Sequence, residues 1–131
     1  WEEEQIYRIA ECFEGGTPLH EKTRGTHSCF LAKDGQLLFQ CEDIGRHNAL
    51  DKAIGYALRH GIPLSRCMVY SSGRIPTDMA MKAIRAGIPI LASKASPTAE
   101  AIALAKEYGL TLVCAARRDR MKLFAGPEPE G

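Results

Sequence analysis

The sequence predicts a three-layer α/β/α protein, in which one mixed, mostly parallel sheet lies between helices. Three observations lead to this prediction. Short apolar runs alternate with helical patterns in the second part of the chain, and two strand-like runs joined by an Asp-Gly pair precede them. The length of 131 residues corresponds to one domain. Strands and helices in this order form a parallel sheet covered on both faces, led in this chain by an antiparallel hairpin.

The first expected elements are a helix and a hairpin. The helix has acidic residues in its first turn and ends at a Gly-Gly pair. Its apolar face consists of Ile6, Ile9, Ala10 and Phe13. Strand-like runs follow at residues 27–32 and 36–41. Because Asp34-Gly35 lies between these runs, we expect them to pair as a hairpin.

Helices and strands alternate in the rest of the chain. A helical pattern begins after Gly45 and stops at Gly61. The expected strands are 67–70, 88–92, 110–114 and 121–124, and the other expected helices are 76–86 and 97–108. We expect Ser96 to be the N-cap of the last helix, with Pro97 at its first position.

The composition is typical of a globular domain without a membrane span. We expect residues 1–125 to form one domain and residues 126–131 to form a flexible tail. No apolar run reaches the roughly 18 residues of a transmembrane helix. The number of cysteines is odd, and no two have C-x-x-C spacing: Cys12, Cys29, Cys41, Cys67 and Cys114. We therefore expect buried free thiols in a protein of the reducing cytoplasm.

The charge of the chain is unevenly distributed. Residues 1–43 carry nine acids and four bases, whereas residues 44–131 carry thirteen bases and seven acids. In sheets of the expected kind, ligands bind outside the carboxyl ends of the parallel strands. The segments expected at those ends contain Arg46, His47, Arg74, Lys94, Arg117, Arg118 and Arg120. We therefore predict an electropositive crevice for an anionic ligand at this edge.

The densest polar cluster is the segment 42–52, in which Arg46, His47 and Asn48 open a helix. Free N–H groups at a helix start attract anions, so these residues are candidates for binding a phosphate or a polar ring. His47 and Asp51 are four residues apart on this helix, so they are expected to pair, which would orient the imidazole. The alternative is a capped, solvated helix start with ordinary ion pairs.

Two further loops are candidate binding segments. In Ser72-Gly73-Arg74, the glycine lets a ligand approach the backbone, although an ordinary turn is the alternative. The run Arg117-Arg118-Asp119-Arg120 carries guanidinium groups that suit phosphates and purine edges, and a solvated turn is its alternative. His27 and Cys29 share a strand face, but zinc needs three or four ligands and nothing completes the set, so we expect no metal.

Several of these motifs resemble one protein family. Residues 42–52, EDIGRHNALDK, closely resemble the signature E-D-(V/I)-G-R-H-N-A-x-D-K of the formate dehydrogenase accessory sulfurtransferase family, FdhD/NarQ. Ser72-Gly73-Arg74 is similar to its S-G-R motif, and residues 86–98 are similar to its A-G-I-P…S-A-P-T stretch. Residues 23–27 resemble its T-G-G-x-H and residues 110–113 its L-T-L-V, so the resemblance extends from about residue 5 to 124.

The resemblance implies a cytidine-deaminase-like fold without zinc. It also implies a homodimer that carries sulfur from a cysteine desulfurase to the molybdenum bis(molybdopterin guanine dinucleotide) cofactor of a formate dehydrogenase. The segment after L-T-L-V is one cofactor-binding stretch of the family. The crevice and the resemblance together give these expected cofactor-binding residues: His27, Arg46, His47, Asn48, Ser72, Gly73, Arg74, Ala115, Ala116, Arg117, Arg118, Asp119 and Arg120.

The sequence also departs from the family pattern. The family carries its persulfide on a C-x-x-C loop that precedes the region this chain resembles, and this sequence contains no such spacing. Arg24 replaces a glycine of the T-G-G-x-H motif, and Cys114-Ala115 replaces Gly-Phe after L-T-L-V. The resemblance therefore implies the C-terminal, nucleotide-binding domain of the family, which is either part of a larger protein or a relative that stands alone.

Four interpretations of the function stay open. The first is a domain that binds the cofactor or GDP in support of sulfur transfer, and the second is a stand-alone guanine-nucleotide-binding module. The third is an enzyme with a persulfide on Cys41 or on Cys29, of which Cys41 is the better candidate because it precedes a basic helix start. The fourth interpretation, nucleic-acid binding, is disfavoured because the bases lie in loops without aromatic platforms. We expect neither nucleic acid nor a membrane as partner.

Overall fold

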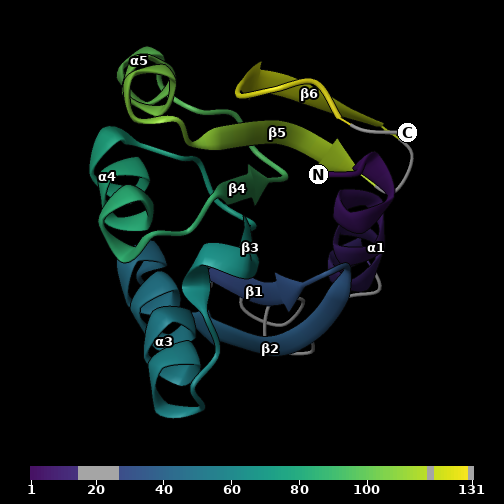
Figure 1. Cartoon of the computed structure of the whole chain (residues 1–131), viewed down its shortest axis with the longest axis vertical. Helices are drawn as coiled ribbons and strands as arrows, with labels where there is room; N and C mark the ends of the chain where they lie inside the picture. The colour runs from purple at the N-terminus through teal and green to yellow at the C-terminus, as the bar shows by residue number, and fades with distance from the viewer. Residues whose placement is uncertain (15–26, 118–119, 130–131) are drawn as a thin grey trace.

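The computed structural model describes residues 1–14, 27–117 and 120–129, and there the chain is a mixed α/β fold around one six-stranded sheet (Figure 1). The elements in chain order are α1 (Glu3–Glu14), β1 (His27–Lys33), β2 (Gln36–Asp43), α3 (Arg46–Arg59), the 3-10 helix η1 (Leu64–Arg66), β3 (Cys67–Ser71), α4 (Thr77–Ala86), β4 (Ile90–Ser93), α5 (Ala99–Tyr108), β5 (Thr111–Arg117) and β6 (Arg120–Ala125). None of the helices in these described ranges is long and apolar enough to cross a membrane.

The sheet has the strand order β2-β1-β3-β4-β5-β6. The β3–β4 and β4–β5 pairs are parallel, whereas the β2–β1, β1–β3 and β5–β6 pairs are antiparallel. The expectation of a mostly parallel sheet is therefore wrong. The leading hairpin joins the parallel strands through an antiparallel β1–β3 contact, and β6 follows β5 too closely in sequence for the crossover that a parallel partner needs.

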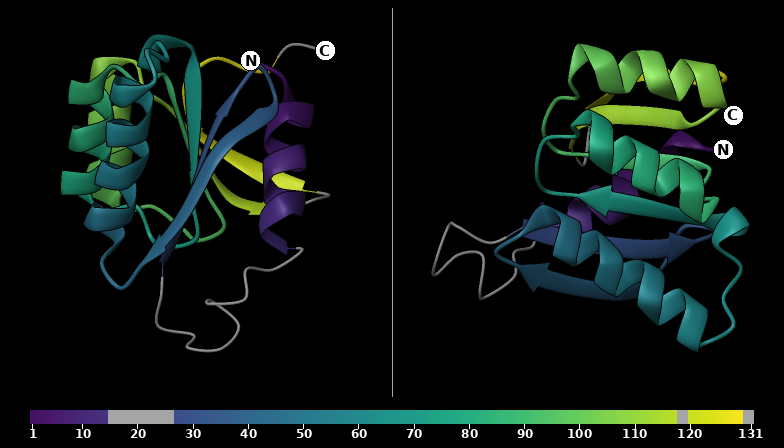
Figure 2. Two further views of the ribbon diagram at one scale, coloured as in Figure 1. Left: turned by 90° about the horizontal axis from the view of Figure 1, so that it is seen from below. Right: turned by 90° about the vertical axis from the view of Figure 1, so that its left-hand side faces the viewer.

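Helices cover both faces of the sheet, with α3, α4 and α5 on one face and α1 on the other (Figure 2). Because side chains alternate along a strand, neighbouring residues of β1 enter different cores. Cys29 and Leu31 pack on the side of α3, while Phe30 packs with Ile6 and Ile9 of α1. Every residue of β3 is buried, as expected of a central strand.

The turns and helix ends follow local sequence signals with one exception. Asp34 and Gly35 have φ angles of 53° and 79°, the left-handed pair that a tight hairpin turn requires. The N-cap of α5 is Thr98 and not the predicted Ser96: the Thr98 Oγ1 accepts a hydrogen bond from the Ala101 N–H at 3.1 Å. Ser96 fails as the cap because its carbonyl accepts from the Ile75 N–H, which keeps this segment extended beside the start of α4.

The predicted tail begins next to the N-terminal residue. The Trp1 indole Nε1 donates a hydrogen bond to the Pro127 carbonyl at 2.8 Å. Residues 130–131 of the predicted tail lie outside the described residues, as do residues 23–26 of the T-R-G-T-H motif.

Candidate functional site

Most of the predicted site residues come from segments that lie at one edge of the sheet. The parallel strands β3, β4 and β5 all end there, and because β1 runs antiparallel to β3, the first residue of β1 lies at the same edge. His27 is the register partner of Asp43 at the end of β2, which brings the start of α3 to this edge too. The topology thus brings segments that are up to ninety residues apart in sequence to one edge of the sheet.

The loop after β3 is held against the start of β1. The Ser72 N–H donates to the Ser28 carbonyl at 3.0 Å, and the Ser72 Oγ accepts from the Ser28 N–H at 2.9 Å. Gly73 then passes so close to His27 that a Cβ on the glycine would lie 2.8 Å from the imidazole Nδ1. The glycine of the S-G-R motif is therefore needed for this close approach.

Ser93 connects the loops that follow the parallel strands. Its fully buried hydroxyl donates to the Gly73 carbonyl at 2.6 Å and accepts from the Ala95 N–H at 3.0 Å. The Ala95 carbonyl in turn accepts from the Ala115 N–H of β5 at 3.0 Å. Ser93 is not among the site residues predicted from the sequence. The available signal was a serine that directly follows an apolar strand at the predicted ligand-binding edge.

The end of β5 departs from regular strand geometry at Ala115. This residue has a φ of 52°, a left-handed conformation that is uncommon for alanine, and the register with β6 shifts between Cys114 and Arg117. The buried Tyr70 hydroxyl fixes the bulge by donating to the Ala116 carbonyl at 2.9 Å. Such bulges and strained residues occur preferentially at binding sites.

A cavity of about 290 Å³ lies beside this bulge. It is lined by Ala115, Arg120, Met121 and Lys122, and Arg120 is exposed. Two of the lining residues are apolar, Ala115 and Met121, and two are cationic, Arg120 and Lys122. The Lys122 ammonium lies over the Phe124 ring, 5.1 Å from its centroid. This combination suits a flat, partly apolar group that carries negative charge nearby.

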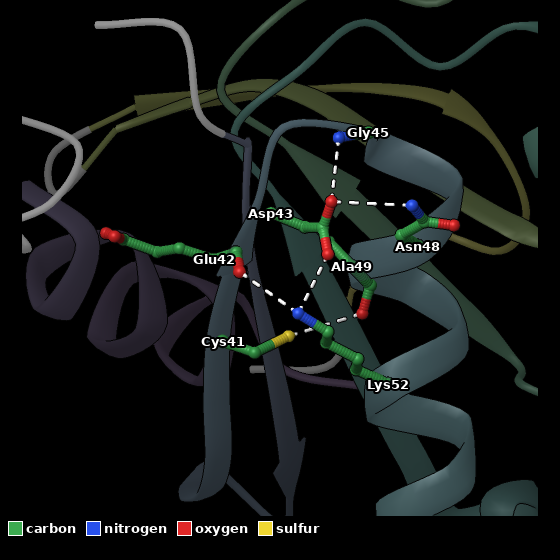
Figure 3. A network of polar contacts seen from close by, with 7 residues as sticks. All are labelled: Cys41, Glu42, Asp43, Gly45, Asn48, Ala49 and Lys52. Atoms are coloured by element: carbon green, nitrogen blue, oxygen red, sulfur yellow. Dashed lines mark hydrogen bonds and ion pairs between the residues drawn. The ribbon is translucent and has the colours of Figure 1, made fainter. Parts of the chain in front are cut away.

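At the other end of the same edge, Asp43 organises the turn into α3 (Figure 3). Its carboxylate forms an ion pair with the Lys52 ammonium at 2.8 Å and accepts hydrogen bonds from the Gly45 N–H at 3.0 Å and the Asn48 amide at 3.4 Å. The Lys52 ammonium and the Gly45 N–H lower the pKa of Asp43 from 3.8 to about 2. Asp43 therefore stabilises the turn in which it lies. This supports the alternative of a solvated helix start for part of the motif.

The structure separates the two basic clusters that the sequence placed in one crevice. β2 and β5 are four inter-strand steps apart in the sheet, which is roughly 19 Å at about 4.8 Å per step. The side chains of Arg46, His47 and Arg117 lie outside the described residues, as do Arg118 and Asp119 entirely. The partner expected for His47, Asp51, forms an ion pair with Lys82 of α4 at 3.0 Å.

Cys41 lies at the base of the same network. Its sulfur donates a hydrogen bond to the Ala49 carbonyl of α3 at 3.3 Å (Figure 3). A hydrogen bond from the Cys29 thiol and the charge of Lys52 outweigh burial and lower the pKa of Cys41. Within the described part of the chain, no three His, Cys, Asp or Glu side chains gather in a way that could hold a metal ion.

Comparisons with known proteins agree with the motifs at this edge. The sulfur carrier protein FdhD of Halalkalibacterium halodurans is 38% identical over 125 residues, which cover 95% of this chain and 46% of that protein. The FdhD of Streptomyces coelicolor is 44% identical over 110 residues, covering 82% of this chain and 39% of that protein. This chain therefore spans about half the length of the curated relatives that it matches.

Solved structures give the same result for the fold. A structure described as a formate dehydrogenase accessory protein from Desulfotalea psychrophila matches with a TM-score of 0.86 and 40% identity, covering 96% of this chain and 54% of that one. A bifunctional deaminase/reductase from Thermotoga maritima matches with a TM-score of 0.65 at 16% identity, covering 86% of this chain and 37% of that one, and it shares the fold alone. The model of the FdhD/NarQ family matches residues 1–129, and the chain belongs to that family.

Proposed function

We propose that this chain binds the guanine-dinucleotide end of a molybdenum cofactor at the edge where β3, β4 and β5 end. We further propose that it takes part in sulfur transfer to that cofactor during maturation of a formate dehydrogenase. Family membership supports the second part, because the relatives are sulfur carriers and a matching structure is described as a formate dehydrogenase accessory protein. The first part rests on the geometry of the edge.

The observation that carries the binding proposal is the cavity beside Ala115. Its volume of about 290 Å³ is close to the lower limit of about 300 Å³ for ligand pockets, and we assign to it the purine ring system of the cofactor. Ala115 and Met121 provide wall area for the ring, and no carboxylate is among the described residues that line the cavity. Arg120 and Lys122 carry positive charge at this lining, which favours an anionic ligand.

The chain's own residues have separate tasks in this proposal. Arg120 and Lys122 bind the diphosphate next to the base, since guanidinium and ammonium groups pair strongly with phosphate oxygens. Ser93 orients the surrounding loops through its contacts with Gly73 and Ala95. When bound, the cofactor supplies the molybdenum centre that receives the sulfur. Hydrogen bonds among buried backbone groups keep the binding edge formed before the ligand arrives.

The partners in this proposal are a cysteine desulfurase, as the source of sulfur, and a formate dehydrogenase, as the recipient of the completed cofactor. Cytoplasmic location and assembly as a homodimer belong to the same proposal. They rest on the family to which the chain belongs.

Calorimetric titration with GDP and with ADP tests the proposed ligand class. GDP should bind with a measurable heat and at least about tenfold more tightly than ADP, a difference of about 1.4 kcal/mol. Equal affinity for the two nucleotides, or no heat with GDP, would contradict guanine recognition. Binding of GDP without retention of the molybdenum cofactor would instead favour the stand-alone guanine-nucleotide module.

A further inference from the structure

Cys29 and Cys41 are directly opposite each other on the antiparallel strands β1 and β2. Both side chains point to the face that α3 covers, because Cys29 belongs to that core and Cys41 packs against it. The Ser28 carbonyl accepts a hydrogen bond from the Ser72 N–H, on the side of β3. Because the backbone groups of successive strand residues point to opposite sides, those of Cys29 point toward β2. The two cysteines therefore form a hydrogen-bonded pair with a Cα separation of about 5.5 Å. Disulfides span Cα separations of about 4.4–6.8 Å and Cβ separations of about 3.5–4.5 Å. Opposite Cβ atoms on antiparallel strands are about 4.5–5.5 Å apart, so the bond forms when the two strands approach each other by roughly 1 Å.

The two thiols differ in accessibility. Cys29 is fully buried, whereas Cys41 is partly buried beside the first turn of α3. A small reagent thus reaches the sulfur of Cys41 before that of Cys29. The Cys41 sulfur donates to a carbonyl that belongs to α3, that of Ala49, so it lies at the boundary between the sheet and the helix.

Their electrostatic environments reinforce this order. The Cys29 thiol donates a hydrogen bond to the Cys41 sulfur, which raises the pKa of Cys29 and lowers that of Cys41. The Lys52 ammonium lowers the pKa of Cys41 further, while burial and the carboxylates of Asp43 and Glu42 oppose this shift. The thiolate is the nucleophile of cysteine chemistry, so Cys41 is the attacking group and Cys29 is held as its protonated neighbour.

We propose that Cys41 and Cys29 form a redox couple in which Cys41 reacts with a hydroperoxide and Cys29 resolves the product to an intramolecular disulfide. In the first step the Cys41 thiolate attacks one peroxide oxygen and the O–O bond breaks, so that Cys41 becomes a sulfenic acid. The other peroxide oxygen leaves as hydroxide and takes up a proton to become water. In the second step the Cys29 sulfur attacks the Cys41 sulfur, the S–O bond breaks, and water leaves. Two thiols lose two electrons, and hydrogen peroxide is reduced to two molecules of water.

This couple is independent of the cofactor proposal, because none of its atoms belongs to the cavity beside Ala115. Its effect falls on the other end of the edge. The disulfide would remove the Cys41 hydrogen bond to Ala49 and join the strands two residues before Asp43. Oxidation therefore acts on the turn that leads into α3.

Peptide mapping after peroxide treatment tests the couple. The reduced protein is treated with hydrogen peroxide, its remaining thiols are alkylated, and it is digested with trypsin without reductant. Cleavage at lysine and arginine places Cys29 in the peptide 25–33 and Cys41 in the peptide 34–46. The proposal predicts a linked 25–33/34–46 species that lacks two hydrogen atoms and disappears on reduction. A folded protein that yields no such species, or links Cys41 to Cys12 or Cys67 instead, would overturn it.

Variants then establish the order of the two steps. In Cys29→Ser, the sulfenic acid on Cys41 should persist and be captured by dimedone. In Cys41→Ser, Cys29 should stay reduced at the same peroxide dose. Cys12→Ser removes an exposed thiol and is the matched control, so the linked species should form in it as in the parent. Oxidation of Cys29 in Cys41→Ser at the parental rate would contradict the assignment of Cys41 as the attacking thiol.

Discussion

The Ser93 hydroxyl donates a hydrogen bond to the Gly73 carbonyl across 2.6 Å, joining the loops that follow two neighbouring parallel strands. The same oxygen accepts from the Ala95 N–H, so one side chain satisfies a backbone donor and a backbone acceptor. This arrangement fixes the middle of the candidate edge before any ligand is present. It also makes the edge sensitive to a change of a single oxygen atom.

Replacing Ser93 by Ala should lower the free energy of unfolding by about 1–3 kcal/mol, because two backbone groups lose their partner in a buried place. Urea denaturation measures this change. Ser96→Ala is the control, since Ser96 is an exposed serine three residues along the chain and should change stability by less than about 0.5 kcal/mol. Equal effects of the two substitutions would contradict the role of Ser93.

Thr98→Ala should cost about 1 kcal/mol of unfolding free energy, because it removes the side-chain cap of α5. Thermal or urea unfolding of this variant beside Ser96→Ala decides between the observed cap and the one that the sequence predicted. If Ser96→Ala is the more destabilising of the two, Thr98 is not the residue that caps α5.

Gly73→Ala should displace the His27 imidazole, because the added Cβ would lie 2.8 Å from its Nδ1. We expect GDP affinity to fall at least about tenfold if the loop moves with the ring, a loss of about 1.4 kcal/mol. Gly55→Ala is the control: Gly55 lies inside α3 and outside the left-handed region, and its added Cβ would meet only the Arg59 guanidinium at 3.4 Å. Parental GDP affinity in Gly73→Ala would mean that the close approach is not needed for binding.

Asp43 should make the protein sensitive to acid. Its pKa is lowered from 3.8 to about 2 in the folded state, so its contribution to stability is present above pH 3.8 and is lost as pH falls toward 2. Asp43→Asn should therefore be less stable than the parent at pH 6, and the difference should shrink by pH 2. Thermal unfolding across this range is the measurement. Lys52→Gln removes the same ion pair, so its loss of stability relative to the parent should also shrink between pH 6 and pH 2. If the difference in stability between Asp43→Asn and the parent is the same at pH 6 and at pH 2, the stabilising role of the ionised Asp43 is wrong.

Local signals in the sequence were enough for most elements. The Asp34-Gly35 turn was predictable because its left-handed angles suit few other residue pairs, and the alternation of apolar runs located the later strands. The family was predictable from residues 42–52, and the match of the family model to residues 1–129 confirms it.

Contacts between residues that are far apart in the sequence could not be predicted from local patterns. The antiparallel contact of β1 with β3 depends on which edge of the parallel strands the hairpin joins. Asp51 pairs with Lys82, thirty-one residues away, and not with a neighbour on its own helix. Ser93 gains its role only when the loops after β3 and β4 meet. Each depends on tertiary packing, which short sequence windows do not contain.

The most direct test of the proposed binding site is calorimetric titration of GDP into three proteins: the parent, Arg120→Ala and Arg59→Ala. Arg120 lines the cavity beside Ala115, whereas Arg59 is exposed at the far end of α3. Arg120→Ala should weaken GDP binding about ten- to a hundredfold, the loss of one charge-assisted contact of about 1.5–3 kcal/mol. Arg59→Ala should bind like the parent. If Arg120→Ala also binds GDP with parental affinity, the guanine nucleotide does not occupy this cavity and the proposed site is wrong.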